Sequence, residues 1–230
     1  MSHRIFELPP ALWPDNTPAI QLLCSRQRKT SDTAHLWLKK SFAFTGTPPE
    51  SFVKLKTVHT FAWHGTLLSD YPATSIVDTK AGFRLQLHGA DQILPEITDW
   101  DAIHGTNWLI VDDEIMFPAQ PSLIGSGTYH MHAIRGQFGT TTSAHKTGSE
   151  AWIIRSKDLN PIKTRWHLPG GSAAFKFTIG SQDIGQRQVT VHNFSQAYAD
   201  PPATPAVGAL CINPAGELQT WSGKAWVAAT

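Results

Sequence analysis

The sequence predicts an all-β protein, an antiparallel β-barrel or sandwich domain with one short helix. Nine Trp and eleven Phe in 230 residues favour strands, and 17 Gly and 16 Pro supply the turns between them. The apolar stretches are short, and several alternate between apolar and polar positions as half-buried strands do. No run of about 18 apolar residues is present, so no membrane-spanning helix is expected.

Composition and charge narrow the classes of function. The chain is 41% hydrophobic and 16% charged, with a net charge of +1, so no basic excess points to nucleic acid or a lipid surface. The N-terminal residues MSHRIFELPPALWPD lack an uninterrupted apolar segment, and no secretory signal is predicted. Cys24 and Cys211 lie far apart and form no metal motif. We expect two reduced, buried thiols, with a disulfide as the alternative.

The chain is expected to fall into four parts. Residues 1–18 contain four prolines and are predicted as an extended arm. Residues 19–194 form the β-rich domain. Residues 195–208 are rich in proline and alanine, which is typical of a linker. Residues 209–230 are predicted as a small β meander with turns at 213–216 and 222–223.

The first half of the β-rich domain contains strands and then one helix. Residues 82–89 show the clearest alternation, with Phe83, Leu85 and Leu87 on one face and polar residues on the other. The other strands are expected at residues 19–26, 33–41, 51–69 and 75–79. A short helix is predicted over residues 99–103, with Thr98 as its N-cap and Gly105 as its stop.

A module of four strands and one dense loop runs from Asn107 to Ile154. Its strands are expected at residues 107–111, 114–117, 128–134 and 151–154, and Pro118 is expected to end the second one. Within residues 128–134, the side chains at 129, 131 and 133 share one face. The loop RGQFGTT follows, and its Gly136 and Gly139 have the spacing of a tight turn with positive φ. Three more strands are predicted at residues 160–168, 173–179 and 187–194.

Candidate catalytic chemistry is sparse. His130 and His132 share a strand face, and with Glu114 and His145 they could complete a metal site, which would suit a metal-dependent hydrolase. The simpler interpretation is a pair of exposed or interface histidines, with no metal. The carboxylates at residues 112–114 could hold a cation or act as acid and base, but a hairpin turn with its carboxylates in water is the simpler interpretation. Ser126 and Ser172 lack the context of a nucleophile, and no helix follows Gly139 to cradle a phosphate. We therefore expect no enzyme activity and no cofactor.

The nine tryptophans allow a carbohydrate-binding hypothesis, because flat aromatic faces stack on sugar rings. Most of them lie in apolar or strand context, where core packing is the simpler interpretation. Trp221 and Trp226 lie in the polar C-terminal segment and are the two expected to be most exposed. They are the candidate contacts for a ligand or partner.

The module also resembles a known family. The residues that carry the resemblance are HGTNWLIVDDEIMF (residues 104–117), GTYHM (127–131), RGQFGTT (135–141), His145 and Gly148. This pattern is similar to tail-tip hub proteins of long-tailed phages and to the equivalent baseplate protein of gene transfer agents. The chain departs from the family in being much shorter and in having Asp112 where glycine is common.

The resemblance implies a structural role in a virion. It implies a homo-oligomer, with a trimer favoured, that contacts other tail-tip or baseplate proteins. A tail fibre or a host surface glycan is the further partner that it allows. It also implies location at the virion tail tip after assembly in the host cytoplasm. Within the motif, Arg135 is expected to bind Glu114 or Asp113. Thr140 and Thr141 should bond nearby backbone groups, and His145 and Gly148 should close the loop.

Overall fold

The computed structural model confirms an all-β fold. It describes residues 2–14, 17–25, 33–39, 52–73, 77–89, 93–163, 172–180, 187, 189–194, 210–212, 218–221 and 226–228. The chain divides into two compact units. Unit 1 comprises residues 1–12, 21–32 and 58–160, and unit 2 comprises residues 13–20, 33–57 and 161–230. No helix among the described residues is long and apolar enough to cross a membrane.

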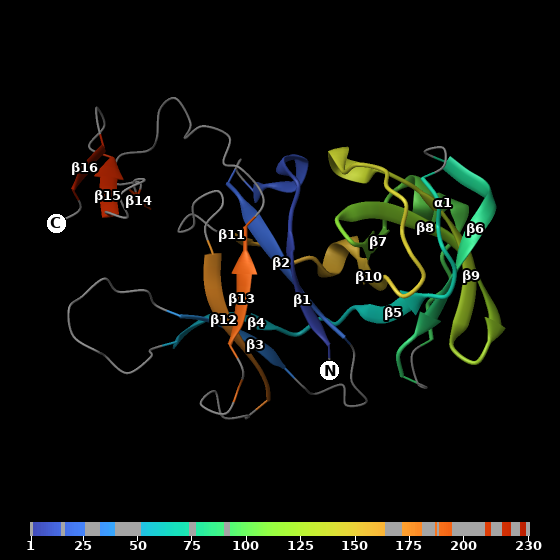
Figure 1. The fold of residues 1–230 in the computed structure, drawn as a ribbon, viewed down its shortest axis with the longest axis horizontal. Coiled ribbons are helices and arrows are strands. Elements are labelled where there is room, and N and C mark those ends of the chain that lie inside the picture. The colour runs from blue at the N-terminus through green and yellow to red at the C-terminus, as the bar shows by residue number, and fades with distance from the viewer. Residues whose placement is uncertain are drawn as a thin grey trace. The chain divides into compact units, whose positions relative to one another are not determined.

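Unit 1 contains a closed, six-stranded antiparallel barrel (Figure 1). Its strands follow the order β10-β5-β6-β9-β8-β7 around the barrel, and each is hydrogen-bonded to its two neighbours. Closure leaves the barrel with no free sheet edge. The strands are β5 (Trp63–Leu67), β6 (Val77–Leu87), β7 (Asn107–Val111), β8 (Glu114–Gly125), β9 (Thr128–Ile134) and β10 (Glu150–Arg155).

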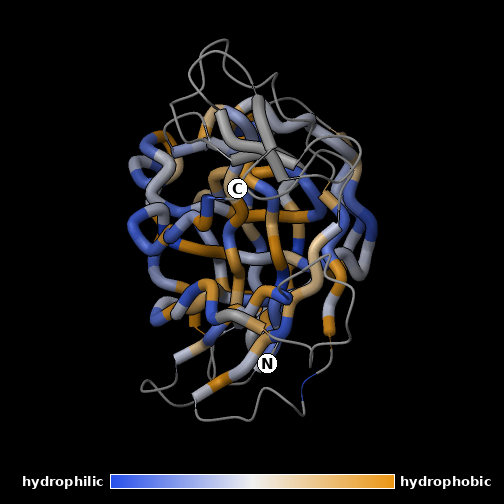
Figure 2. Tube along the Cα trace, turned by 90° about the vertical axis from the view of Figure 1, so that its left-hand side faces the viewer, coloured by the Kyte–Doolittle hydropathy of each residue, from blue (hydrophilic) through white to orange (hydrophobic). Residues whose placement is uncertain are grey.

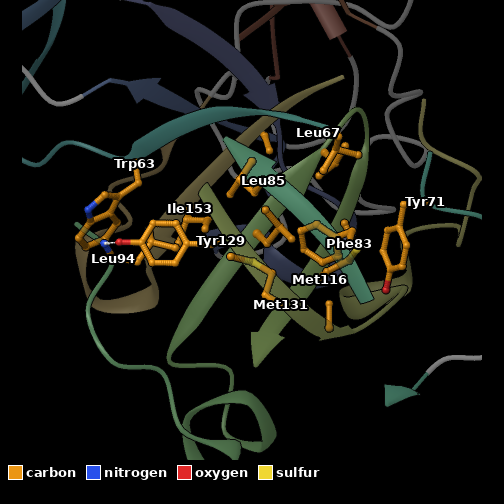
Figure 3. Packing of buried hydrophobic residues seen from close by; sticks show 14 of the residues in the cluster. Trp63, Leu67, Tyr71, Phe83, Leu85, Leu94, Met116, Tyr129, Met131 and Ile153 are labelled. Carbon is orange, nitrogen blue, oxygen red and sulfur yellow. Dashed lines mark hydrogen bonds between the residues drawn. The ribbon is translucent and has the colours of Figure 1, made fainter. Parts of the chain in front are cut away.

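The apolar side chains of the alternating strands point into the barrel and fill its interior. Hydrophobic and hydrophilic residues alternate along much of the tube in Figure 2. Figure 3 shows Trp63 and Tyr129 toward one end of the packed cluster and Tyr71 beside Phe83 toward the other. The Leu94 amide donates to the Tyr129 hydroxyl oxygen at 3.1 Å. The cluster comprises Trp63, Leu67, Tyr71, Phe83, Leu85, Leu87, Leu94, Leu109, Val111, Met116, Tyr129, Met131, Ala133, Ala151 and Ile153.

The largest differences from the predicted strands occur at three places. The prediction that Pro118 ends its strand is wrong, because β8 continues to Gly125 and pairs Pro118 with Ala133. The register then shifts between Ala119 and Ser122, and Gln120 has a φ of 46°. An interrupted ladder of this kind tolerates the missing proline donor. The two strands predicted over residues 75–89 are one bulged strand, β6, and residues 51–69 form two strands, β4 (Phe52–Val58) and β5.

The predicted helix is confirmed as α1 (Asp99–Ile103), with Thr98 as its N-cap. Thr98 and Asp101 form a capping box. The Asp101 amide donates to Thr98 Oγ1 at 3.2 Å, and the Thr98 amide donates to Asp101 Oδ2 at 2.9 Å. Gly105 follows the helix with a φ of 59°, and a Cβ there would lie 2.6 Å from the Phe117 ring. Glycine is therefore required at this position by both backbone and space.

The remaining strands form three smaller sheets. One has the order β1-β2-β11, so the predicted N-terminal arm contains a strand. A four-stranded sheet has the order β13-β12-β3-β4, and β14-β15-β16 form the C-terminal meander. The predicted linker at residues 195–208 and the two meander turns lie outside the described residues. These strands are β1 (His3–Glu7), β2 (Ala19–Cys24), β3 (Ala34–Lys39), β11 (Ile162–Lys163), β12 (Ser172–Ile179), β13 (Thr190–Asn193), β14 (Leu210–Ile212), β15 (Leu218–Trp221) and β16 (Trp226–Ala228).

Cys24 is a buried, free thiol, as expected. Burial in β2 raises the pKa of its thiol well above the ordinary range, so the thiolate needed for metal binding or disulfide exchange is disfavoured. The side chain of Cys211 lies outside the part of the chain that the structure describes.

Gly65 of β5 lies close to the backbone of the neighbouring strand β6. A Cβ at this position would lie 2.3 Å from the carbonyl oxygen of Gln86 on the neighbouring strand. Gly65→Ala should therefore lower the free energy of unfolding by about 1–3 kcal/mol, because the backbone of β6 must move. Gly125→Ala is the matched control, since its nearest neighbour is a Thr128 side-chain atom at 3.6 Å. Urea unfolding of both variants tests this, and equal shifts would contradict it.

Candidate functional site

The centre of the motif is a buried ion pair between Arg135 and Glu114. Arg135 follows β9, and Glu114 begins β8. Arg135 Nε donates to Glu114 Oε1 at 3.0 Å, and Nη2 donates to Oε2 at 2.6 Å, so the contact is bidentate. Both side chains are fully buried. Of the two partners expected for Arg135, the structure selects Glu114.

Arg135 also fastens two loops to the barrel. Its guanidinium donates to the backbone carbonyls of Pro72 and Ser143. The Tyr71 ring lies 4.3 Å from the guanidinium carbon, in cation–π contact. The planar, multi-donor group therefore joins the strand ends to the segment after β5 and to the loop before β10, which a lysine could not do with the same geometry.

Glu114 accepts hydrogen bonds from further groups around it. The backbone amides of Gly136 and Ser143 donate to it at 3.0 and 3.1 Å, and its Oε2 lies 2.9 Å from His145 Nε2. Burial alone would raise the pKa of this carboxyl. The hydrogen bonds from His145, Arg135 and Ser143 outweigh burial and lower its pKa to about 2. Glu114 is therefore the anion around which the loops are arranged.

His145 joins Glu114 to the β7–β8 turn. Its Nδ1 lies 2.7 Å from Asp112 Oδ2 while Nε2 faces Glu114, so both ring nitrogens meet carboxylates. Burial lowers the pKa of this imidazole, but its hydrogen bonds to Glu114 and Asp112 raise the pKa above its ordinary value. The charged imidazolium, with two N–H donors, satisfies both partners. The backbones of His145 and Tyr71 also exchange hydrogen bonds at 2.8 Å.

The glycine loop has the backbone conformation that its sequence predicts. Gly136 and Gly139 have φ values of 61° and 78°. Thr140 Oγ1 accepts from the Ile115 amide at 3.1 Å and donates to the Gln137 carbonyl at 2.8 Å, as expected of a local backbone partner. Thr141 is exposed. Phe138 also has a positive φ, which the sequence did not suggest, and its ring packs 4.7 Å from that of Trp108.

The other motif residues lie around this network. Asp113 is 99% exposed and pairs with Arg4 at 3.1 Å. Gly148 has a φ of 89° and donates its amide to the Leu67 carbonyl at 2.8 Å, which closes the loop. Asp70 accepts from the Thr147 amide and from Lys146, and these bonds lower its pKa to about 2. Arg4, Asp70 and Tyr71 were missed because no local pattern links them to the motif.

The structure separates the four residues considered for a metal site. Glu114 binds both Arg135 and His145, whereas the His130 and His132 rings pack perpendicular to each other, 5.2 Å apart. Among the described residues, no group of three or more His, Cys, Asp or Glu side chains is placed to hold a metal ion.

The tryptophans differ widely in exposure. Trp63, Trp108 and Trp152 are buried, as core packing predicts. Trp100 is 63% exposed and stacks on His104 at a centroid distance of 3.7 Å. Trp221 pairs directly with Trp226 across β15 and β16, although their side chains lie outside the described part.

Comparison with known proteins adds one finding. Residues 62–152 match the family model described as "Rcc01698-like, C-terminal". The match contains the barrel strands from β5 to the start of β10, with the whole Arg135 network, and covers less than half of the chain. No curated protein matches the chain. The matched region is thus a barrel whose buried charges bind one another, an arrangement suited to holding loops in place.

Proposed function

We propose that this chain is a structural component of the tail tip or baseplate of a phage or phage-like particle. In this role it joins copies of itself and neighbouring tail proteins, including a fibre. The observation that carries the proposal is the motif from His104 to Gly148, which resembles tail-tip hub proteins. Its most buried charged residues, Glu114, Arg135 and His145, bind one another and the loop backbone, which is consistent with a scaffold.

Purified tails test this proposal. Tails should be isolated from particles made by a host that carries the gene, and their proteins identified by mass spectrometry. The chain should be present in a fixed ratio to the other tail proteins, and particles made without the gene should lack a complete tail tip. Tails that assemble fully without the chain would overturn the proposal.

A second candidate is recognition of a surface carbohydrate by the C-terminal meander. The observation that favours it is the register of β15 and β16, which pairs Trp221 with Trp226. A glycan array tests it. Trp221→Ala and Trp226→Ala should each abolish binding, while Trp100→Ala, an exposed tryptophan on the barrel, should not. No binding by the unmodified chain would exclude this function.

A further inference from the structure

Exposed hydrophobic residues gather on one part of unit 1. Nine large hydrophobic residues are exposed in the described part of the chain, and five of them lie between residues 93 and 103 or near the end of β8. Their exposed fractions are high, reaching 74% for Ile93 and 70% for Ile103. We define the acidic-apolar surface by five exposed apolar residues and two exposed carboxylates. They are Ile93, Trp100, Ile103, Leu123 and Ile124, with Glu96 and Asp99.

Hydrogen bonds hold the 93–103 segment along β8. The Leu94 amide donates to the Tyr129 hydroxyl at 3.1 Å, and Tyr129 pairs with Leu123 in the β8–β9 ladder. Further along, the Gln120 amide donates to the Ile97 carbonyl at 3.1 Å. Within the segment, Leu94 and Ile97 are buried. The segment therefore runs along the second half of β8, so its exposed apolar side chains lie on the same part of unit 1 as those of Leu123 and Ile124.

Acidic residues accompany this apolar surface. Residues 93–103 contain three Asp and Glu and no Lys or Arg. Glu96 and Asp99 are exposed, and Asp99 is held at 2.8 Å by Gln120 Nε2. The rest of the chain contains 19 Lys and Arg and 15 Asp and Glu, so the remainder of the same protein carries an excess of positive charge. The fitting partner for this surface is basic and apolar.

Unit 2 offers a surface of that chemistry on its four-stranded sheet. Lys54 Nζ lies 5.3 Å above the Trp37 ring, and Lys176 Nζ lies 4.7 Å above the Phe52 ring. Lys176 pairs directly with Trp37 between β12 and β3. Lys176 itself is buried, whereas Lys54 is exposed and Trp37, Phe52 and Lys56 are partly exposed. We call Trp37, Phe52, Lys54 and Lys56 the basic-aromatic surface.

We propose that copies of this chain associate head to tail, with the acidic-apolar surface of one copy against the basic-aromatic surface of the next. The inference rests on the proposed role in an assembly and names the contact that builds it. Each contact uses the acidic-apolar surface of one copy and the basic-aromatic surface of the other, so each copy keeps one free surface. Further copies can therefore be added until a ring closes or a filament forms. Apolar residues supply buried area, while Glu96 and Asp99 face lysines and set the direction.

Complementary one-sided variants test the proposal on the full chain. Glu96→Lys with Trp100→Ala disables the acidic-apolar surface, and Lys54→Glu with Lys56→Glu disables the basic-aromatic surface. Lys157→Glu is the control, since Lys157 is exposed outside both surfaces. In sedimentation velocity, the unmodified chain and the control should form species larger than dimers, and each double variant should be monomeric. A mixture of the two double variants should form 1:1 dimers, because each retains the surface that the other lacks.

The outcomes separate this inference from the proposed function. A monomeric unmodified chain, a mixture that stays monomeric, or equal loss of association in the Lys157→Glu control would overturn the inference. Circular dichroism spectra establish that each variant is folded. If a variant fails to fold, self-association of the unmodified chain at low and at molar salt tests the inference instead. Its association constant should fall at least about tenfold from low to molar salt. A chain that self-associates but is absent from tails would overturn the function alone.

Discussion

Glu114→Gln should lower the free energy of unfolding by about 3–5 kcal/mol, the cost expected when one partner of a buried ion pair is removed. Arg135 would keep its charge in a fully buried position, with its bidentate partner lost. The glutamine amide also cannot accept at both ends from the amides of Gly136 and Ser143. Urea unfolding followed by tryptophan fluorescence measures the change, because three tryptophans are buried in the described part of the chain.

Asp113→Asn is the matched control for this variant. Asp113 is the neighbouring carboxylate in the same turn, but it is 99% exposed and its ion pair with Arg4 lies at the surface. Its replacement should change stability by less than about 1 kcal/mol. A similar loss in both variants would show that the turn, and not the buried pair, supports the barrel. Combining Glu114→Gln with Arg135→Met should recover part of the loss, because no buried charge is then left alone.

The local parts of the fold follow from short-range sequence patterns. The two-residue periodicity of β6 and β9 placed Phe83, Leu85, Tyr129 and Met131 in the barrel interior. The capping box of α1 is readable because Thr98 and Asp101 are three residues apart. In contrast, the bulge that carries β8 beyond Pro118 depends on its pairing with β9, so local rules ended the strand too early.

The candidate site was predictable only in part, because several of its contacts also depend on how the strands pair. Glu114 could be named as a partner of Arg135 because strand pairing brings the two ends of the module together. The contact between Arg4 and Asp113 joins residues 109 positions apart, and the contact between Asp70 and Lys146 joins residues 76 apart. No periodicity or spacing encodes such pairs, since they depend on how the barrel closes.

Asp112 has a φ of 47°, in the left-handed region that favours glycine. The resemblance to tail-tip hub proteins leads us to expect glycine at this position. The Asp112 side chain, however, accepts from His145 at 2.7 Å. Asparagine and aspartate tolerate this backbone region better than other side chains do. The backbone cost is thus accompanied by a hydrogen bond that glycine could not make, which ties the turn to the network.

The Arg135 network should also make the free energy of unfolding depend on pH. Its two titrating residues, Glu114 and His145, act in opposite directions. Glu114 has a folded-state pKa of about 2, against an ordinary value of 4.5. It contributes roughly 3 kcal/mol above pH 4.5, and this contribution is lost as the pH falls toward 2. His145 has a pKa raised above 6.5, so its contribution is complete below pH 6.5 and is lost as the pH rises through its folded-state value. The network should stabilise the fold most between these limits.

Difference measurements isolate these contributions from other titrating groups. Burial lowers the pKa of His64 and His3, which favours folding at higher pH, and exposed Asp70 also has a pKa of about 2. The unfolding free energy should therefore be compared between the unmodified chain and each variant across pH. The excess stability over His145→Gln should shrink as the pH rises above 6.5, and the excess over Glu114→Gln should shrink as it falls below 4.5. Differences that stay constant across both ranges would show that neither group is ionised as the geometry requires.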